Sequence, residues 1–201
     1  MAKQTQKPMN ATAEQITQVA QELIQTQGYD GFSYRDIADR VGIRSATIHY
    51  YFPAKTDLAL AVARHYRAGF AQKITDLDTS TPEPLERLTG FAAIFQNTLE
   101  ELNRVCLCGM LASEANSLSD EVRTETATFF ADQQTWLAKT IQDGIDSGAI
   151  GLVDAEAFAQ MFLSALEGAM IMASSMDRPE HLADVSNQLV SLLVKTPEPV
   201  S

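Results

Sequence analysis

The sequence predicts an all-α protein with about nine helices, divided into a small N-terminal and a larger C-terminal domain. Three observations support this prediction. Apolar residues recur at intervals of three and four along most of the chain, which is the helical period. Glycine, proline and short polar clusters interrupt that pattern, and no stretch shows the alternation typical of a strand. The charge is also divided unevenly between the two ends.

The charge pattern separates the chain into two parts. The net charge is −11 over 201 residues. Residues 1–70 contain eight Lys/Arg against six Asp/Glu, whereas residues 71–201 contain seven against twenty. A surface that binds nucleic acid needs positive charge, so only the N-terminal part suits that role. The acidic remainder is expected to lie away from phosphates.

Composition excludes several classes of protein. No apolar run approaches the roughly 20 residues that span a bilayer, and the N-terminus has no apolar secretory segment. The two cysteines, Cys106 and Cys108, do not make a disulfide framework. No motif for a metal or another cofactor stands out. We therefore expect a cytoplasmic protein.

Capping residues and breakers predict the N-terminal helices. The first helix is expected to start at a capping box of Thr12 and Gln15 and to end at Gly28. Ser33 is a candidate N-cap for a second helix that runs to about Val41.

A tight turn and a proline bound the third predicted helix. Gly42 suits a left-handed turn, and the third helix follows at about 45–51. It ends before Pro53. A long fourth helix starts at residue 54 or 55 and reaches residues 71–77.

The rest of the chain predicts a separate helical domain. A polar, proline-containing loop at residues 78–84 separates it from the fourth helix. We expect three units: a DNA-binding domain at 9–55, a connecting helix at 56–78 and a ligand-binding and dimerisation domain at 79–197. Further helices are expected at about 82–101, 106–116, 119–147, 154–176 and 179–195.

The second and third helices have the pattern of a helix-turn-helix that binds DNA. In such a motif the second helix enters the major groove and presents its N-terminal residues to the bases. Arg44 suits a guanine or a phosphate, and Thr47 suits a thymine methyl or a base edge. A helical hairpin with incidental polar residues is the alternative. The predicted DNA-contacting residues are Ser33, Arg44, Ser45, Ala46, Thr47, His49, Tyr50, Tyr51 and Lys55.

The same stretch resembles the DNA-binding signature of the tetracycline-repressor (TetR/AcrR) family of transcriptional regulators. The resemblance is dense from about Ile16 to Leu60. Two positions depart from the family pattern: Arg44 stands where a capping Ser is common, so Ser45 is expected to cap instead, and His49 and Tyr50 are in the less common order. The segments that carry it are Ile37-Ala38, Val41-Gly42-Ile43, Ala46-Thr47-Ile48 and Tyr51-Phe52-Pro53-Ala54-Lys55-Thr56-Asp57-Leu58.

The resemblance implies a homodimer that binds a palindromic operator on double-stranded DNA and releases it when a small molecule binds. By motif position, Thr47 and His49 would approach bases or phosphates, and Tyr50, Tyr51 and Lys55 would hold the DNA backbone. We expect the two recognition helices to lie about 34–36 Å apart, one turn of DNA. A ligand would change that spacing by shifting the fourth helix.

Two sets of C-terminal residues are candidates for these further roles. Aromatic and Met residues could line a cavity for an apolar or cationic ligand, and Glu167 is conspicuous within an apolar run; core packing is the alternative for each. The ligand candidates are Phe91, Phe95, Cys106, Met110, Trp136, Met161, Phe162 and Glu167. The helices at 154–176 and 179–195 are expected to dimerise as a four-helix bundle, using Phe158, Ser164, Ala165, Gly168, Ala169, Leu182, Val185 and Leu189.

Two other functions stay open from the sequence. Cys106 and Cys108 could sense oxidants or electrophiles on the same scaffold, although only Arg104 lies near enough in sequence to lower a thiol pKa. A helical enzyme or ligand carrier that does not bind DNA is the second alternative. No catalytic Ser-His-Asp order, phosphate loop or carboxylate pair supports an enzyme.

Overall fold

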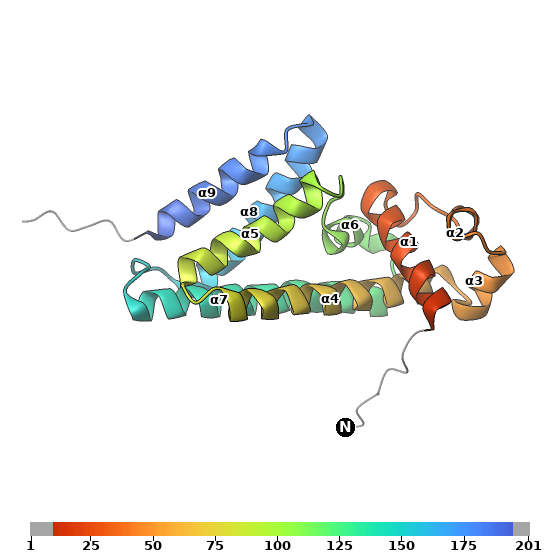
Figure 1. Cartoon of the computed structure of the whole chain (residues 1–201), viewed down its shortest axis with the longest axis horizontal. Helices are drawn as coiled ribbons and strands as arrows, with labels where there is room; N and C mark the ends of the chain where they lie inside the picture. Colours follow the sequence, from red (N-terminus) through yellow and green to blue (C-terminus); the bar gives the residue numbers. More distant parts are fainter. Residues whose placement is uncertain (1–9, 195–201) are drawn as a thin grey trace, which may run out of the picture.

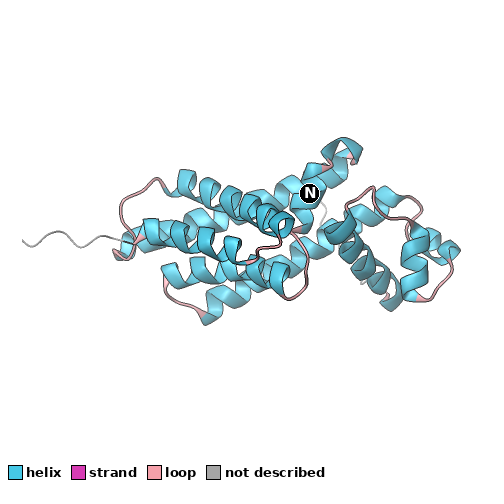
Figure 2. Cartoon of the chain, turned by 90° about the horizontal axis from the view of Figure 1, so that it is seen from above, coloured by secondary structure: helices cyan, strands magenta, loops and turns pink. Residues whose placement is uncertain are grey.

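The computed structural model describes residues 10–194, and this part of the chain is helical, as predicted (Figure 2). It contains nine α-helices and one 3₁₀ turn, Ala115–Ser117. The helices are α1 (Ala11–Gln27), α2 (Tyr34–Val41), α3 (Ser45–Tyr51), α4 (Lys55–Ser80), α5 (Pro84–Glu100), α6 (Leu107–Ser113), α7 (Asp120–Ser147), α8 (Ala155–Met176) and α9 (Glu180–Leu193).

Two apolar clusters divide the molecule into a head and a body (Figure 1). The head comprises α1, α2, α3 and residues 55–63 of α4, packed around Ile16, Ile37 and Ile48, which are fully buried. The body comprises α5, α7, α8, α9 and the remainder of α4, packed around Phe91 and Phe162. Helix α4 therefore belongs to both units, and α6 lies between them in Figure 1.

Local signals explain where the head helices begin and end. Gly42 has φ 75°, so it ends α2 in the left-handed conformation that glycine adopts at least cost. The capping prediction for α1 is wrong by two residues, because Asn10 caps the helix by accepting from Thr12 and Ala13 N–H. Ser45 does not cap α3 either. Arg44 occupies the N-cap position without a capping side-chain bond, and Ser45 is the first helical residue.

The head core also contains side chains from far along the sequence. Leu107 and Leu111 of α6, with Leu118 and Val122 beside the start of α7, pack into the same cluster as α1. Apolar packing therefore crosses the predicted boundaries between 9–55, 56–78 and 79–197, because side chains that follow α4 in the sequence pack with helices that precede it. Residue 9 and residues 195–197 of those ranges lie outside the described residues.

Polar contacts join the long helices of the body. Arg67 of α4 pairs with Glu125 and Asp132 of α7 at 2.9 and 2.6 Å. Near the C-terminal end of α4, Trp136 of α7 donates to both carboxylate oxygens of Asp78 at 3.1 Å. These contacts hold α4 along α7, so a displacement of one helix has to involve the other.

Helix α8 is apolar enough to meet the length and composition criteria for a membrane span. Its mean hydropathy is 1.3, and 39% of its most apolar window is buried within the chain. Its inner face supplies Leu163, Leu166 and Met170 to the body core. Its outer face also has apolar residues, among them Met161 and Met172, which are exposed.

Candidate functional site

Helix α3 presents a polar face to solvent. Ile48 is its buried residue and anchors the helix in the head core. Arg44, Ala46 and His49 are exposed, and the Tyr50 side chain is 80% exposed. Ser45 and Thr47 are half-buried. The candidate residues of this helix therefore share one accessible surface, with hydrogen-bond donors of several kinds.

Aromatic residues hold this face in place. The Tyr34 hydroxyl donates to the Phe52 carbonyl at 2.9 Å, which fixes the end of α3 against the start of α2. Burial raises the pKa of Tyr34 to about 12, so the hydroxyl stays a donor. The Tyr34 and His49 rings lie 4.7 Å apart between centroids. Tyr51 is half-buried, and its hydroxyl accepts from the Asn10 side chain at 2.8 Å.

Lys55 lies differently from the sequence expectation. Its ammonium donates to the Phe32 carbonyl at 2.5 Å and lies over the Tyr29 and Phe32 rings, 4.9 and 4.3 Å from their centroids. Burial lowers the pKa of Lys55, although nearby carboxylates oppose that shift. The group is engaged in packing the loop between α1 and α2. The DNA contacts proposed below therefore omit it.

Arg35, near the start of α2, is a candidate DNA-binding residue that was not predicted from the sequence, whereas Ser33 was. Ser33 is exposed, but both its N–H and its hydroxyl donate to Asp36 at 2.7 Å. These bonds lower the pKa of Asp36. Arg35 follows with a side chain that is 87% exposed and a long, 3.9 Å ion pair to Asp39. Arg35 lies in the first turn of α2, two residues after the predicted N-cap Ser33, and this position could have identified it from the sequence.

Helix α6 attaches the head to the body. Glu114, just after α6, accepts from the backbone N–H groups of Tyr29 and Asp30, both at 3.0 Å. Gln25 of α1 donates to the Val105 carbonyl at 2.7 Å. The loop after α1 and the two ends of α6 are thus held together by bonds that span about 80 residues of sequence.

The aromatic ligand candidates pack mainly against each other. Phe91, Phe95 and Phe162 are buried, and Phe91 meets Phe95 and Phe162 at ring centroid distances of 5.5 and 6.4 Å. Trp136 stacks on the outer side of Phe91 at 5.4 Å, with its ring nitrogen engaged by Asp78. Met161 points outward and is 45% exposed. In this structure these rings form the body core.

Glu167 and Cys106 do come together, with Met110 close by. The Glu167 carboxyl group hydrogen-bonds the Cys106 thiol, and its Oε1 is buried with no hydrogen-bond partner among the described residues. Burial raises the pKa of Glu167 to about 7. Its Oε2 lies against Gly109, where an added Cβ would approach it to 2.7 Å. Met110, the next residue, is half-buried.

The surroundings of the two thiols argue against a sensor role. Both sulfur atoms are buried and reduced. Burial, reinforced by Glu167, raises the pKa of Cys106 and of Cys108 well above the usual value. The reactive species is the thiolate, which this environment disfavours. The thiol-sensor alternative is therefore not favoured.

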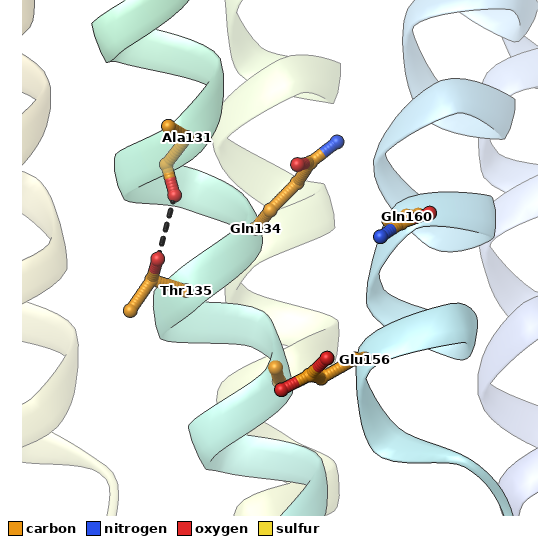
Figure 3. Close-up of a pocket in the computed structure, with 6 residues that line it drawn as sticks. Ala131, Gln134, Thr135, Glu156 and Gln160 are labelled. Carbon is orange, nitrogen blue, oxygen red and sulfur yellow. Dashed lines mark hydrogen bonds between the residues drawn. The ribbon is translucent and has the colours of Figure 1, made fainter.

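The surface of the described residues has three hollows of about 380 Å³ each, and two of them lie beside α8. One lies between α7 and α8, where Gln134 and Gln160 project from facing helices, with Glu156 below them (Figure 3). The other, called the junction pocket, lies where the head meets the body. It is lined in part by Gln25, Arg104, Val105, Met110, Ile171 and Ser174.

The predicted dimerisation residues divide between surface and interior. Ala169, Leu182 and Leu189 are buried in the core of their own chain, so the dimer surface proposed below omits them. Ser164 and Gly168 are exposed; Phe158, Ala165 and Val185 are half-buried. Exposed apolar residues that were not predicted to dimerise lie on the same two helices, and they include Met161, Met172 and Leu192.

Comparison with known proteins agrees with this architecture. Residues 16–62 match the model of the bacterial regulatory proteins of the tetR family, and residues 84–189 match the tetracyclin repressor-like C-terminal domain. A TetR-family regulator from Agrobacterium tumefaciens superposes with a TM-score of 0.89 and 30% identity, covering 92% of this chain and 98% of that one. A TetR regulator from Legionella pneumophila gives 0.83 and 29%, covering 93% and 100%.

Curated relatives have the same character. The chain is 28% identical over 154 residues to the transcriptional repressor KstR2 of Mycolicibacterium smegmatis, which covers 74% of this chain and 72% of the relative. It is 26% identical over 125 residues to the repressor DhaR of Mycobacterium sp. GP1, with 62% of each covered. The fold, the helix-turn-helix and these matches together place the chain in the tetR family of DNA-binding transcriptional regulators.

Proposed function

We propose that the chain is a cytoplasmic repressor, without catalytic activity, that a small molecule releases from a palindromic operator. The observation that carries the proposal is the exposed face of α3, with Arg44, His49 and Tyr50 accessible around the buried anchor Ile48. The repressor names of the relatives KstR2 and DhaR support the direction of regulation.

The proposed DNA contacts divide by chemistry. Arg44 and Thr47 lie at the N-terminal end of α3, the part of a recognition helix that meets base edges. Tyr50 and Tyr51 donate to phosphates, and Arg35 adds a phosphate contact from α2. Ser33, Ser45, Ala46 and His49 complete the surface.

The operator is bound by a dimer in this proposal. Gly168 and Ser164 on α8 let a partner helix approach closely, and the exposed Met161, Met172 and Leu192 supply apolar area. Such an interface explains why α8 is apolar on both faces. In such a dimer a two-fold axis relates the two heads, as a palindromic site requires.

A gel-shift experiment at low salt tests the DNA-binding part. The full-length protein should retard a fragment of its own upstream region, and Arg44→Ala should weaken binding about 5- to 150-fold, the range for one good arginine–base contact. Lys139→Ala is the matched control, because Lys139 is an exposed cation on α7, away from the head. Equal binding by wild type and Arg44→Ala would contradict the proposed surface.

A second measurement separates base reading from phosphate binding. Arg35→Ala removes a proposed phosphate contact, so it should lower affinity for all sequences and reduce the salt dependence of log K by about one unit. Arg44→Ala should instead change the preference among operator variants. If the wild-type protein does not bind DNA and neither substitution changes that result, the alternative of a helical enzyme or ligand carrier that does not bind DNA is favoured.

A further inference from the structure

The junction pocket has an unusual neighbour, the carboxyl group of Glu167. Met110 and Ile171 line the pocket. Glu167 lies one helical turn before Ile171 on α8, and its Oε2 lies against Gly109, the residue before Met110. The pocket wall therefore contains Ile171, one turn from Glu167 on α8, and Met110, the residue after Gly109 on α6. Part of the Glu167 residue also reaches solvent, whereas Oε1 does not.

No group in the described part of the chain neutralises this carboxyl. The ionisable groups on which its charge acts are Tyr66 of α4 and the two thiols, Cys106 and Cys108, and burial keeps all three uncharged at neutral pH. Arg104, which lines the pocket, pairs with Glu22 at 3.1 Å, and Arg67, whose charge acts on Cys108, pairs with Glu125 and Asp132. A buried carboxylate without a counter-charge is costly, and a cation from outside would offset that cost.

We propose that the junction pocket with Glu167 is a binding site for a small organic ammonium ion that has an apolar chain. The ammonium donates to Oε1 of Glu167 after the flexible Met110 side chain moves aside. Val105 and Ile171 contact the apolar chain, and the Ser174 hydroxyl lies at the rim. A volume of about 380 Å³ is within the range of small-molecule sites.

This site is placed to affect the head directly. Its walls include Gln25 of α1 in the head and Ile171 of α8 in the body, and the bond from Gln25 to Val105 crosses between them. A ligand there has different contacts when the head changes its orientation, which is the requirement for control of DNA binding. The ligand class deepens the proposed function and rests on it for its regulatory consequence.

Three probes with the same six-carbon chain test the charge preference. Hexylamine, 1-hexanol and hexanoate are titrated by calorimetry into the full-length protein at pH 8, without DNA. Hexylamine should bind at least tenfold more tightly than either other probe. Equal binding of hexylamine and hexanol, tighter binding of hexanoate, or no binding of hexylamine would overturn the proposal.

Variants assign the preference to this carboxyl. Glu167→Gln keeps the shape and should reduce hexylamine affinity to that of hexanol. Glu156→Gln changes an exposed carboxylate on the same helix and should have no effect. Ser174→Arg adds a cation at an exposed rim position, so it tests the site even if Glu167→Gln folds poorly. Unchanged hexylamine binding in Ser174→Arg would overturn the assignment.

The pH dependence gives an independent readout. Protonation neutralises Glu167, whose pKa lies at about 7. Hexylamine affinity should therefore be constant above pH 8 and fall up to tenfold per unit below pH 7, whereas hexanol affinity should not. A pH-independent hexylamine affinity would overturn the proposal.

A gel shift then separates this inference from the proposed function. In wild type, and not in Glu167→Gln, hexylamine should weaken DNA binding severalfold. Ammonium binding by a protein that ignores DNA would retain the site and overturn the repressor. DNA binding by a protein that does not discriminate hexylamine from hexanol would retain the repressor and overturn the site.

Discussion

At the scale of single residues, burial decides what each polar group can do. Lys55 and Arg44 are both cations of the head, yet the first packs on Tyr29 and Phe32 while the second is exposed. Cys106 is buried, and burial raises its pKa, which disfavours the reactive thiolate. Glu167 is the residue whose burial has the largest consequence for pH.

Glu167 should make the stability of the protein depend on pH. Its folded-state pKa, about 7, lies above the ordinary 4.5, so its contribution is fully present below pH 4.5 and is lost as pH rises through 7. The shift corresponds to about 3 kcal/mol. Urea unfolding of wild type and Glu167→Gln at pH 4 and pH 8 measures it. The variant should gain about 3 kcal/mol relative to wild type at the higher pH.

The outcome that would contradict this prediction is a constant difference between the two proteins at both pH values. Glu156→Gln provides the control, because its carboxylate is exposed and should leave the difference near zero.

The thiols provide a second residue-scale prediction. Because both sulfur atoms are buried and their pKa values are raised, Ellman's reagent should react with the folded protein at least a hundredfold more slowly than with the urea-unfolded protein, on the order expected when local opening is required. Absorbance at pH 8 follows the reaction. Rapid reaction of either thiol in the folded state would restore the sensor alternative.

At the scale of elements, α6 is the short helix that connects the two units. Its apolar residues Leu107 and Leu111 pack into the head, and Glu114 at its end accepts two backbone N–H groups of the α1–α2 loop. Gly28, with φ 81°, lies directly beside the Glu114 carboxylate, which leaves no room for a side chain. The α1–α2 loop and the end of α6 are therefore one packed joint.

Removing the Glu114 charge should loosen this joint. Glu114→Gln replaces one acceptor by an amide NH₂ that faces an N–H donor, and a hydrogen bond to a charged group contributes about 1.5–3 kcal/mol. Urea unfolding should show a loss of that size. Glu86→Gln, at an exposed position on α5, is the control. Hydrogen exchange at Tyr29 and Asp30 should accelerate in Glu114→Gln alone; unchanged exchange would show that the carboxylate does not hold the loop.

The sequence predicted the helices because their boundaries depend on local chemistry. Gly28, Gly42 and Pro53 are signals that depend on a few neighbouring residues, and each bounds a helix as expected. The exposed face of α3 could also be predicted from the sequence, because its residues are spaced around the apolar Ile48. These features do not depend on distant parts of the chain.

The contacts between units could not be predicted in the same way. The bond between Tyr29 and Glu114 joins residues 85 apart, and no local pattern marks either partner. The contact of Lys55 was not predictable for the same reason, because its acceptor is the backbone carbonyl of Phe32, a group that every residue has. Burial of Leu182 and Leu189 in their own chain likewise depended on which face of α9 meets α5 and α8.

At the scale of the whole molecule, the outer face of α8 determines the proposed assembly. Met161, Gly168 and Met172 lie on one side of this helix, away from Leu163 and Leu166, which face the core. Met172 is 52% exposed. A continuous exposed apolar patch marks an interaction site, and the pairing of two α8 helices would cover the apolar residues of this face.

A charge on this face should separate the dimer. Met172→Glu places a carboxylate in the proposed interface, where it would meet its own copy across the two-fold axis. Sedimentation should show a monomer, and operator affinity should fall by roughly 100-fold as the two half-sites become independent. Leu152→Glu, at a position 94% exposed outside these helices, should remain dimeric. A dimeric Met172→Glu protein would show that the dimer interface lies elsewhere on the molecule.

The shared head core has a consequence for building chimeric regulators. Because Leu107, Leu111, Leu118 and Val122 complete the core around α1, a transplanted head would leave unmatched apolar surfaces on both sides of the graft. An exchange of operator specificity between relatives therefore needs residues 107–122 of the donor as well as its first 63 residues. The recipient would then contribute the ligand response, while the donor joint would determine how strongly that response reaches the DNA.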